Sequence, residues 1–172
     1  MRTRLVRQAL TGVLLLAALA AAPAVKAALP MPQGPVILSV TGNITATNAE
    51  GRADFDRAML QALGVTTLTT WTPWTEGEVA FKGVLGATLL DAVGAQGQTV
   101  RAVAVNDYAA DIPASDFRKY RILLATNMAG KQLRLRDKGP IWIIFPWTGH
   151  PELDDDATRY KSVWQVKELV VR

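Results

Sequence analysis

Short runs of apolar and β-branched residues, separated by Gly, Pro and Asn, dominate the sequence after residue 35. Each run is too short for a typical helix and has the length of a strand. The runs that predict strands are Val36–Val40, Val65–Thr70, Val79–Phe81, Thr99–Val105, Ile122–Ala125, Ile141–Phe145 and Leu169–Val171. The run before Pro146 is the most apolar of them. The pattern therefore predicts a chain with many short strands.

Helical periodicity is weaker and is confined to three short stretches. Asp54 suits the N-cap of a helix that ends at Gly64 and places Phe55, Met59, Leu60 and Leu63 on one face. A second helix is predicted over residues 88–93, and a third begins near residues 112–116. Because strands outnumber helices, we predict an α+β fold with a mixed, largely buried β-sheet and short helices.

The first 27 residues differ from the rest and have the pattern of an export signal. Three arginines precede an apolar stretch of about 14 residues, which is followed by small residues around Val25-Lys26-Ala27. The stretch is shorter than the ~20 residues of a spanning helix. We expect a cleaved secretory signal at 1–27, with a cut after Ala24 or a retained anchor as alternatives. A proline-rich lead-in at 28–35 and one domain at 36–172 follow, and we expect no stable membrane insertion of the mature chain.

Removing this segment changes what the charge implies. The chain has 19 Lys and Arg against 15 Asp and Glu, and four of these cations lie within residues 1–27, so the remainder is balanced. A nucleic-acid binder needs a basic surface, which the composition does not support. The chain has no cysteine and a single histidine, His150, which excludes disulfides, thiolate metal ligands and a multi-histidine metal site. We expect a periplasmic protein held together by burial alone.

Two loops that follow predicted strands carry unusual polar or aromatic residues. Trp71-Thr72-Pro73-Trp74 offers two indoles around a proline, either as core and lid or as a stacking wall for a heteroaromatic ring. Asn106-Asp107-Tyr108 is either an ordinary turn or a ligand site. In the second case a carboxylate accepts hydrogen bonds from the amidine-like edge of a pterin or guanine, and Tyr108 stacks or donates.

Two further segments carry cations beside apolar strands. Arg136-Asp137-Lys138-Gly139-Pro140 is either a solvated charged turn or a loop that approaches a ligand through Gly139. Arg159-Tyr160-Lys161-Ser162-Val163-Trp164 offers cations and a hydroxyl for a phosphate or carbonyl oxygen. Trp164 belongs either to the core or to a stacking platform.

These blocks, in this order, resemble the sulfite-oxidase-like molybdopterin-binding domain over about Val36 to Val171. The resemblance rests on Phe81-Lys82-Gly83-Val84, Asn106-Asp107-Tyr108 with Ile112-Pro113, Leu123-Leu124-Ala125, Gly139-Pro140 before an apolar strand, and Arg159 followed by Ser162-Val163-Trp164. It implies an α+β fold that binds a pterin-type cofactor at its strand ends. In the enzymes of that family a cysteine thiolate binds molybdenum, whereas the corresponding stretch here is Leu68-Thr69-Thr70-Trp71.

Without a thiolate, the chain is similar to periplasmic pterin-binding regulators of membrane-bound cyclic-di-GMP enzymes. The resemblance implies a non-enzymatic protein that binds a reduced pterin, such as a tetrahydropterin, and signals to the periplasmic domain of a membrane signalling protein or sensor kinase. It implies the pterin-binding residues Trp71, Trp74, Asn106, Asp107, Tyr108, Arg136, Lys138, Arg159, Ser162 and Trp164. The alternatives are a molybdopterin-dependent oxidoreductase or subunit, and an interaction scaffold whose pocket is filled by side chains.

Overall fold

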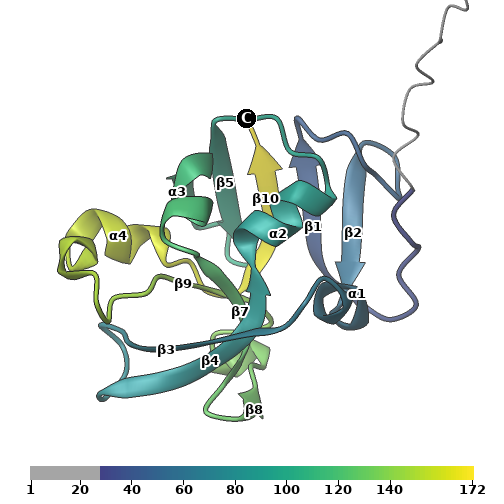
Figure 1. Cartoon of the computed structure of the whole chain (residues 1–172). Coiled ribbons are helices and arrows are strands. Elements are labelled where there is room, and N and C mark those ends of the chain that lie inside the picture. Colours follow the sequence, from purple (N-terminus) through teal and green to yellow (C-terminus); the bar gives the residue numbers. More distant parts are fainter. Residues whose placement is uncertain (1–27) are drawn as a thin grey trace, which may run out of the picture.

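Two five-stranded sheets form the framework of the computed structural model, which describes residues 28–172 (Figure 1). The strands are β1 (Val36–Gly42), β2 (Arg52–Asp56), β3 (Thr66–Trp71), β4 (Glu78–Leu85), β5 (Thr99–Ala104), β6 (Ala109–Pro113), β7 (Leu123–Met128), β8 (Lys131–Gln132), β9 (Trp142–Ile144) and β10 (Val166–Val171). The helices are α1 (Arg57–Ala62), α2 (Gly86–Ala92), α3 (Ala114–Lys119) and α4 (Asp156–Lys161), with 3-10 turns at Leu135–Asp137 and Pro151–Leu153. This is the predicted α+β class, with short helices.

The first sheet has the strand order β2-β1-β10-β5-β6 and brings the two ends of the domain together. β1 pairs in parallel with β10, and the other neighbours are antiparallel, so the sheet is mixed as predicted. Helices α2 and α3 cross one face of this sheet (Figure 1). Gly86 allows these helices to approach closely, because a Cβ there would lie 2.3 Å from the ring of Phe117.

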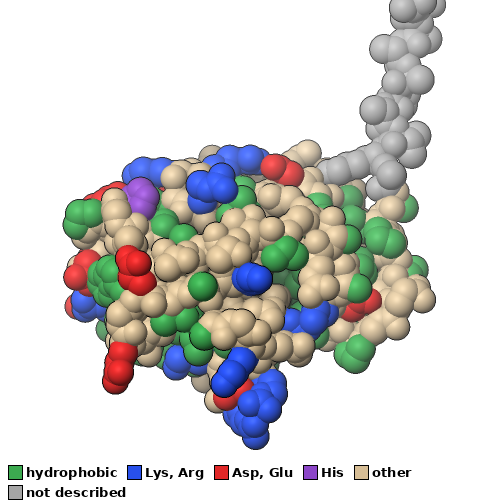
Figure 2. All heavy atoms as spheres, turned by 60° about the horizontal axis from the view of Figure 1, so that its bottom comes forward, with side chains coloured by type: hydrophobic (Ala, Val, Ile, Leu, Met, Phe, Trp, Pro, Cys, Tyr) green, Lys and Arg blue, Asp and Glu red, His purple; other side chains and the backbone are tan. Residues whose placement is uncertain are grey.

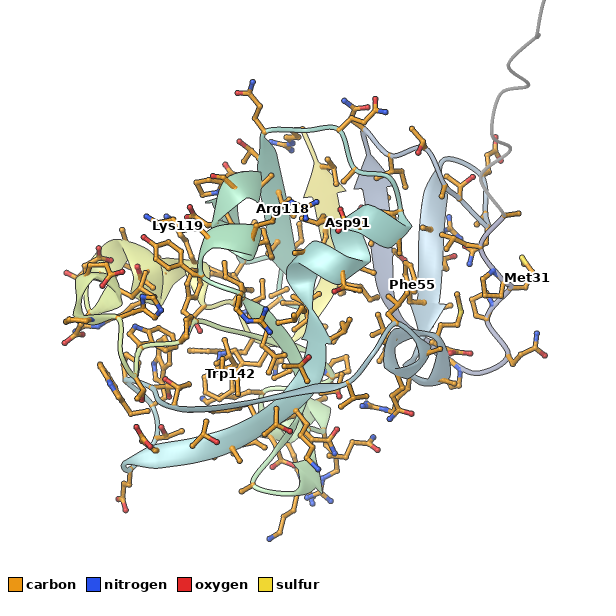
Figure 3. All side chains as sticks on the ribbon, in the orientation of Figure 1. Met31, Phe55, Asp91, Arg118, Lys119 and Trp142 are labelled. Carbon is orange, nitrogen blue, oxygen red and sulfur yellow. The ribbon has the colours of Figure 1, made fainter. Side chains whose placement is uncertain are left out.

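The second sheet has the order β3-β4-β7-β8, with β9 also paired to β7. β4 and β7 approach closely at Gly83, where an added Cβ would lie 2.0 Å from the Leu124 carbonyl oxygen. Buried side chains from both sheets form one continuous core that includes Leu38, Phe55, Phe81, Phe117, Trp142 and Leu169. Figure 3 shows Phe55 and Trp142 inside this core, and Arg118 of α3 beside Asp91 of α2, with which it forms an ion pair.

The predicted helix that begins at Asp54 is wrong in its first residues. Asp54 and Phe55 belong to β2, where Asp54 pairs with Ser39 of β1 and its carboxylate accepts hydrogen bonds from Ser39 and Arg52. The helix starts only at Arg57, with the carboxylate of Asp56 accepting from the Met59 N–H. Pairing with β1 therefore overrides the local N-cap signal at Asp54.

Other differences concern short or polar elements. The sequence signals did not reveal β6, which precedes the third predicted helix, or α4, whose residues are mostly polar. A tight hairpin turn at Ala129 and Gly130, both with positive φ, connects β7 to β8. The predicted export signal lies outside the described residues, and within 28–172 no helix is long and apolar enough to cross a membrane.

Candidate functional site

All five tryptophans of the chain gather in one cluster beside the second sheet. Trp74 is at its centre, with ring centroids 5.4, 5.9 and 6.2 Å from those of Trp164, Trp142 and Trp147. Trp71 packs against Trp147 at 6.1 Å. Most of these contacts are edge-to-face, the arrangement that aromatic pairs prefer. The tryptophan cluster thus joins loops that are almost a hundred residues apart in the sequence.

The indole N–H groups divide this cluster into a core part and an open part. Trp142 and Trp147 are buried, and their Nε1 atoms donate to Ser162 and to the Leu153 carbonyl oxygen. Trp74 and Trp164 are half-buried, and within residues 28–172 their Nε1 atoms have no hydrogen-bond partner. Neither atom is enclosed by protein. Trp71 is also half-buried, and its Nε1 atom has no partner within the same residues. Three donors therefore remain for solvent or for a ligand.

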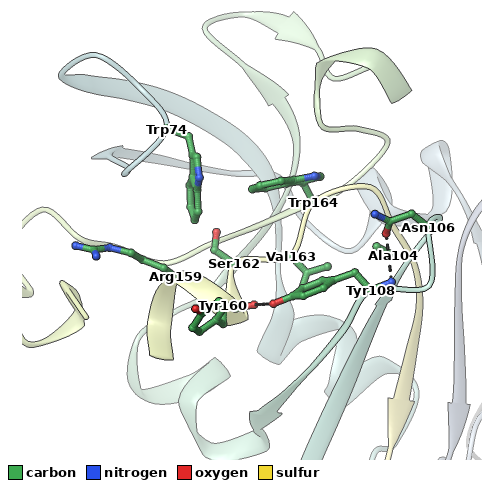
Figure 4. Close-up of a pocket in the computed structure, with 9 residues that line it drawn as sticks. All are labelled: Trp74, Ala104, Asn106, Tyr108, Arg159, Tyr160, Ser162, Val163 and Trp164. Atoms are coloured by element: carbon green, nitrogen blue, oxygen red, sulfur yellow. Dashed lines mark hydrogen bonds between the residues drawn. The ribbon is translucent and has the colours of Figure 1, made fainter. Parts of the chain in front are cut away.

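Two of these three indoles, Trp74 and Trp164, line a pocket of about 320 Å³. Its lining residues are Trp74, Ala104, Asn106, Tyr108, Arg159, Tyr160, Ser162, Val163 and Trp164. In Figure 4, Trp74 and Trp164 lie on one side and Tyr108 and Tyr160 on the other, with Ser162 between them. The volume is within the range of about 300–1,000 Å³ of small-molecule sites, and most lining groups are apolar or aromatic. The side chains of residues 28–172 leave this pocket open.

Hydrogen bonds hold the side of the pocket that faces the tryptophans. The Tyr108 hydroxyl donates to the Tyr160 carbonyl oxygen at 2.9 Å, and the Asn106 side-chain oxygen accepts from the Tyr108 N–H at 3.2 Å. Partial burial raises the pKa of Tyr108, with a smaller contribution from Tyr160, so the phenol stays a neutral donor. The Asn106 amide nitrogen has no partner in the described chain and can donate to a ligand.

Arg159 supplies the positive charge at the pocket. Its guanidinium forms ion pairs with Asp154 at 2.6 Å and with Asp156 at 2.8 Å. The hydrogen bond that Arg159 donates to the Asp154 carboxylate is the main cause that raises the pKa of Arg159. Because both carboxylates are close, the charge presented to a ligand is partly neutralised. The two carboxylates therefore fix the orientation of the guanidinium and reduce its attraction for a strongly anionic ligand.

Lys138 lies against the tryptophan cluster but is not among the residues that line the pocket. Its Nζ atom is 4.3 Å from the centroid of the Trp164 ring and 5.4 Å from that of Trp142. The backbone at Lys138 is left-handed (φ 69°), and its carbonyl oxygen accepts from the Gln165 N–H. This cation–π contact orients the indole of Trp164.

Six of the ten residues predicted for the site therefore meet at one pocket, namely Trp74, Asn106, Tyr108, Arg159, Ser162 and Trp164. Ser162 differs in its use, since its hydroxyl donates to the Ile143 carbonyl oxygen at 2.6 Å and accepts from Trp142 at 3.1 Å. The hydroxyl proton of Ser162 is donated to Ile143 and is therefore not available to a ligand oxygen. Through its bond with Trp142, Ser162 instead holds the tryptophan cluster in place.

Like Lys138, three further predicted residues do not line the pocket, namely Asp107, Arg136 and Trp71. The Asp107 side chain is 83% exposed and pairs with Lys167 at 2.7 Å, which lowers the pKa of Asp107 mainly through that hydrogen bond. The Arg136 side chain is 71% exposed and lies 3.8 Å from the Asp137 carboxylate. Figure 2 shows a group of Lys and Arg side chains at the lower end of one face of the molecule. Trp71 packs on Trp147 instead.

Sequence reasoning missed three lining residues, Ala104, Tyr160 and Val163. Tyr160 lies in the predicted segment that begins at Arg159, but it contributes through its backbone carbonyl oxygen, which accepts a hydrogen bond from the Tyr108 hydroxyl. A backbone acceptor carries no sequence signal. Ala104 and Val163 are buried apolar residues that look like ordinary core in the sequence.

The position expected for a molybdenum ligand has different chemistry. Thr70 is fully buried, and its hydroxyl donates to the Trp71 carbonyl oxygen and accepts from the Thr148 N–H. The chain has no cysteine, and within residues 28–172 no group of His, Cys, Asp or Glu side chains is arranged to hold a metal. The residues present fit the organic, pterin part of a molybdenum cofactor, and they offer no thiolate to its metal.

Comparisons with known proteins agree on the fold. No curated protein matches the sequence significantly. Among solved structures, the sulfane dehydrogenase SoxCD from Paracoccus pantotrophus matches with a TM-score of 0.59 and 18% identity, over 78% of this chain. The chain spans 37% of that structure's chain, so the likeness concerns one part of a longer protein. The sequence model of the oxidoreductase molybdopterin binding domain matches residues 40–150. The chain therefore belongs to the oxidoreductase molybdopterin-binding domain family.

Proposed function

We propose that this chain binds a pterin ring in the pocket lined by Trp74, Trp164 and Tyr108. The observation that carries the proposal is the pair of half-buried indoles whose N–H groups have no partner within residues 28–172. A pterin is a flat heterocycle with several hydrogen-bond acceptors on its edges. Indole and phenol rings provide stacking surfaces for such a ring, and the indole N–H and Asn106 amide groups provide donors.

The proposal assigns recognition of the ring to the indole N–H and Asn106 amide groups, and no longer to the predicted acceptor Asp107. Its carboxylate is exposed and paired with Lys167, so recognition of the ring through Asp107 has no support in the geometry. Tyr108 fits the predicted covering role, because its ring faces the tryptophans across the pocket (Figure 4). Arg159 lies where it can contact a substituent on the ring.

A thermal and optical titration tests this proposal. A ligand at 100 times its dissociation constant adds about 2.7 kcal/mol to the free energy of unfolding. We expect tetrahydrobiopterin or molybdopterin to raise the melting temperature and to quench tryptophan fluorescence. The Trp164→Leu variant should lose both effects. The matched control Trp71→Phe removes another indole of the same cluster, outside the pocket, and should keep them. If no pterin shifts melting or fluorescence, pterin binding is wrong.

The family match favours a second candidate, in which the pterin is molybdopterin and the chain is a molybdenum oxidoreductase or a subunit of one. The cofactor supplies the redox chemistry when bound, whereas the residues of this chain would bind and orient its organic part. Metal analysis of the protein purified from its native source distinguishes the two. Stoichiometric molybdenum supports the enzyme, and an organic pterin alone, identified by mass spectrometry, supports a binding protein.

We also propose that the bound pterin is a signal, as the resemblance to regulators of cyclic-di-GMP enzymes implies. Support for this role is the missing thiolate and the export pattern of residues 1–27, which lie outside the described residues. The expected partner is the periplasmic domain of a membrane signalling protein. Co-purification of such a protein that depends on added pterin, and is lost in Trp164→Leu, tests the role. Partner binding that is unchanged without pterin contradicts it.

A further inference from the structure

The strand β3 ends its sheet with an unpaired edge. It pairs with β4 on one side, and no other strand within residues 28–172 pairs with it. The Trp71 end of this edge is covered, because Thr148 contacts the Trp71 N–H and the Thr70 hydroxyl. Over Thr66–Thr69, no backbone group has a partner outside β4 in the described chain. The main-chain groups that face away from β4 are therefore available along four residues.

This edge lacks the features by which proteins commonly protect such strands. Residues 65–71 contain no charge and no proline, and the β3–β4 register runs without a bulge. Thr67 and Thr69 are exposed and β-branched, and Thr66 and Leu68 are half-buried. Proteins usually block exposed edges with lysine, proline, a bulge or a covering segment. The absence of these devices at 65–69 is consistent with an edge that receives another strand.

A groove of about 160 Å³ runs beside Thr66, Thr67 and Leu68. Its remaining lining residues are Leu85, Lys119, Tyr120, Arg121, Pro146 and His150. None of the lining residues is acidic. Glu152 contacts the His150 imidazole at 3.0 Å, and Lys119 donates to the Tyr120 hydroxyl at 2.6 Å, so these two polar groups are partly engaged.

Arg121 is the most available cation of this groove. It is exposed, it forms no ion pair or hydrogen bond through its side chain within residues 28–172, and its backbone is left-handed at φ 52°. Non-glycine residues in this conformation are uncommon and often lie at functional positions. Six other arginines of the described chain have a carboxylate partner, namely Arg52, Arg101, Arg118, Arg134, Arg136 and Arg159.

We propose that this groove binds an extended, acidic peptide segment of a partner protein, which adds a strand to β3. The backbone edge at Thr66–Thr69 provides main-chain hydrogen bonds, and Lys119 and Arg121 on the opposite wall select carboxylate side chains. Peptide addition to a sheet edge commonly combines main-chain pairing with side-chain pockets in this way. The proposal does not depend on pterin binding, since none of the groove residues lines the tryptophan pocket.

The test uses the full chain and three capped hexapeptides in isothermal titration. The probe is Ac-Val-Glu-Val-Glu-Val-Glu-NH₂. One comparison peptide has Lys in place of Glu, and the other is the acidic peptide with its central valine replaced by proline. We expect binding by the acidic peptide alone, together with slower amide hydrogen exchange at residues 66–69. Proline removes a backbone donor and should abolish binding if the peptide adds as a strand.

Two charge variants identify the wall of the groove. Arg121→Glu should weaken binding of the acidic peptide by about tenfold or more. Lys131→Glu changes net charge equally at an exposed hairpin position and should leave the affinity unchanged. The proposal is overturned if the acidic peptide does not bind, if the proline peptide binds equally well, or if both variants weaken binding to the same extent. Pterin titrations of Arg121→Glu should match wild type, which separates failure here from failure of the proposed pterin site.

Discussion

Buried hydrogen bonds to single side chains fix the geometry of the tryptophan pocket. Ser162 is the clearest case, because its hydroxyl connects Trp142 of β9 to the Ile143 carbonyl oxygen from a position two residues before Trp164. The hydroxyl does so in a buried environment, where an unmatched donor or acceptor costs free energy. A polar residue at a pocket can therefore serve the protein framework more than the ligand.

Replacing Ser162 tests this role. Ser162→Ala leaves the Ile143 carbonyl oxygen without its side-chain donor and weakens the bonding of the Trp142 N–H, so we expect a loss of about 1–3 kcal/mol in the free energy of unfolding. Urea denaturation measures it. The control Ser115→Ala changes an exposed serine and should stay within about 0.5 kcal/mol of wild type. Equal stability of the two variants would show that Ser162 does not hold the cluster.

Asp56 fixes the lead-in segment to the domain. Its carboxylate accepts hydrogen bonds from the backbone N–H groups of Met59, Gly34 and Gln33, each at 2.8 Å. The Met59 and Gly34 bonds contribute most to lowering the pKa of Asp56 below its ordinary value of 3.8. The ionised carboxylate thus connects residues 33–34 to the first turn of α1.

This lowered pKa predicts a pH-dependent contribution to stability. The contribution is complete above the ordinary pKa of 3.8 and is lost as the pH falls through the lower pKa of the folded state. Wild type should therefore be more stable than Asp56→Asn at pH 7, and the difference should shrink below about pH 4. Urea unfolding at pH 7 and pH 3 measures it, with the exposed Glu50→Gln as control. A difference that does not depend on pH would contradict the assignment.

At the scale of elements, the second sheet depends on a close backbone approach of β4 and β7. Gly83 faces Ala125 directly after a register shift at Lys82, and the Leu124 carbonyl oxygen occupies the space of a potential side chain. The same block, Phe81-Lys82-Gly83-Val84, supports the family resemblance in the sequence. A glycine in a strand interior commonly marks such close backbone contact.

A methyl group at this position should disturb the pairing of β4 with β7. We expect Gly83→Ala to lower the free energy of unfolding by about 1–3 kcal/mol or more, because the backbone must move to relieve the overlap. Thermal melting followed by circular dichroism checks this. Gly34→Ala is the matched control, since its Cβ meets Asp56 only at the ordinary contact distance of 3.6 Å. A harmless Gly83→Ala would mean that the two strands are farther apart than described.

For the whole molecule, one core connects the two sheets. Phe55 of the first sheet and Phe81 and Trp142 of the second belong to the same buried cluster. The tryptophans, in contrast, lie together near the second sheet and the segment before β10. Tryptophan fluorescence therefore reports on that side of the molecule, whereas far-ultraviolet circular dichroism reports on both sheets.

The continuous core predicts a single cooperative unfolding transition. The midpoints from fluorescence and from circular dichroism should coincide in a urea titration, as they do for small domains that unfold in one step. Two separated midpoints would show that the sheets unfold independently and that the shared core contributes little coupling. Single-tryptophan replacements such as Trp71→Phe should change the fluorescence amplitude more than the agreement between the probes.

Particular elements show how far sequence patterns predict this fold. The apolar run before Pro146 predicts β9, because a strand that is buried at every position needs such a run. The pattern predicts only the Leu169–Val171 part of β10, because Lys167 and Glu168 interrupt the apolar sequence. At Asp54 and Phe55 the local pattern predicts helix where the structure has β2, because β2 forms by pairing with β1, a contact between separated segments. α4 was missed because its six residues, Asp156–Lys161, carry little apolar periodicity and its N-cap is one of several neighbouring acids.

The sequence by itself determined the α+β class, the lack of any thiolate ligand and six of the nine residues that line the pocket, because composition and strand-end loops are local properties. Only the tertiary structure decided that Asp107 turns toward Lys167, that Ser162 serves Trp142, and that the Tyr160 carbonyl completes the pocket. It alone also decided that one edge of β3 has no partner strand within residues 28–172. These outcomes depend on which distant backbone and side-chain groups meet, and hydrogen-bond partners across the chain leave no trace in local sequence patterns.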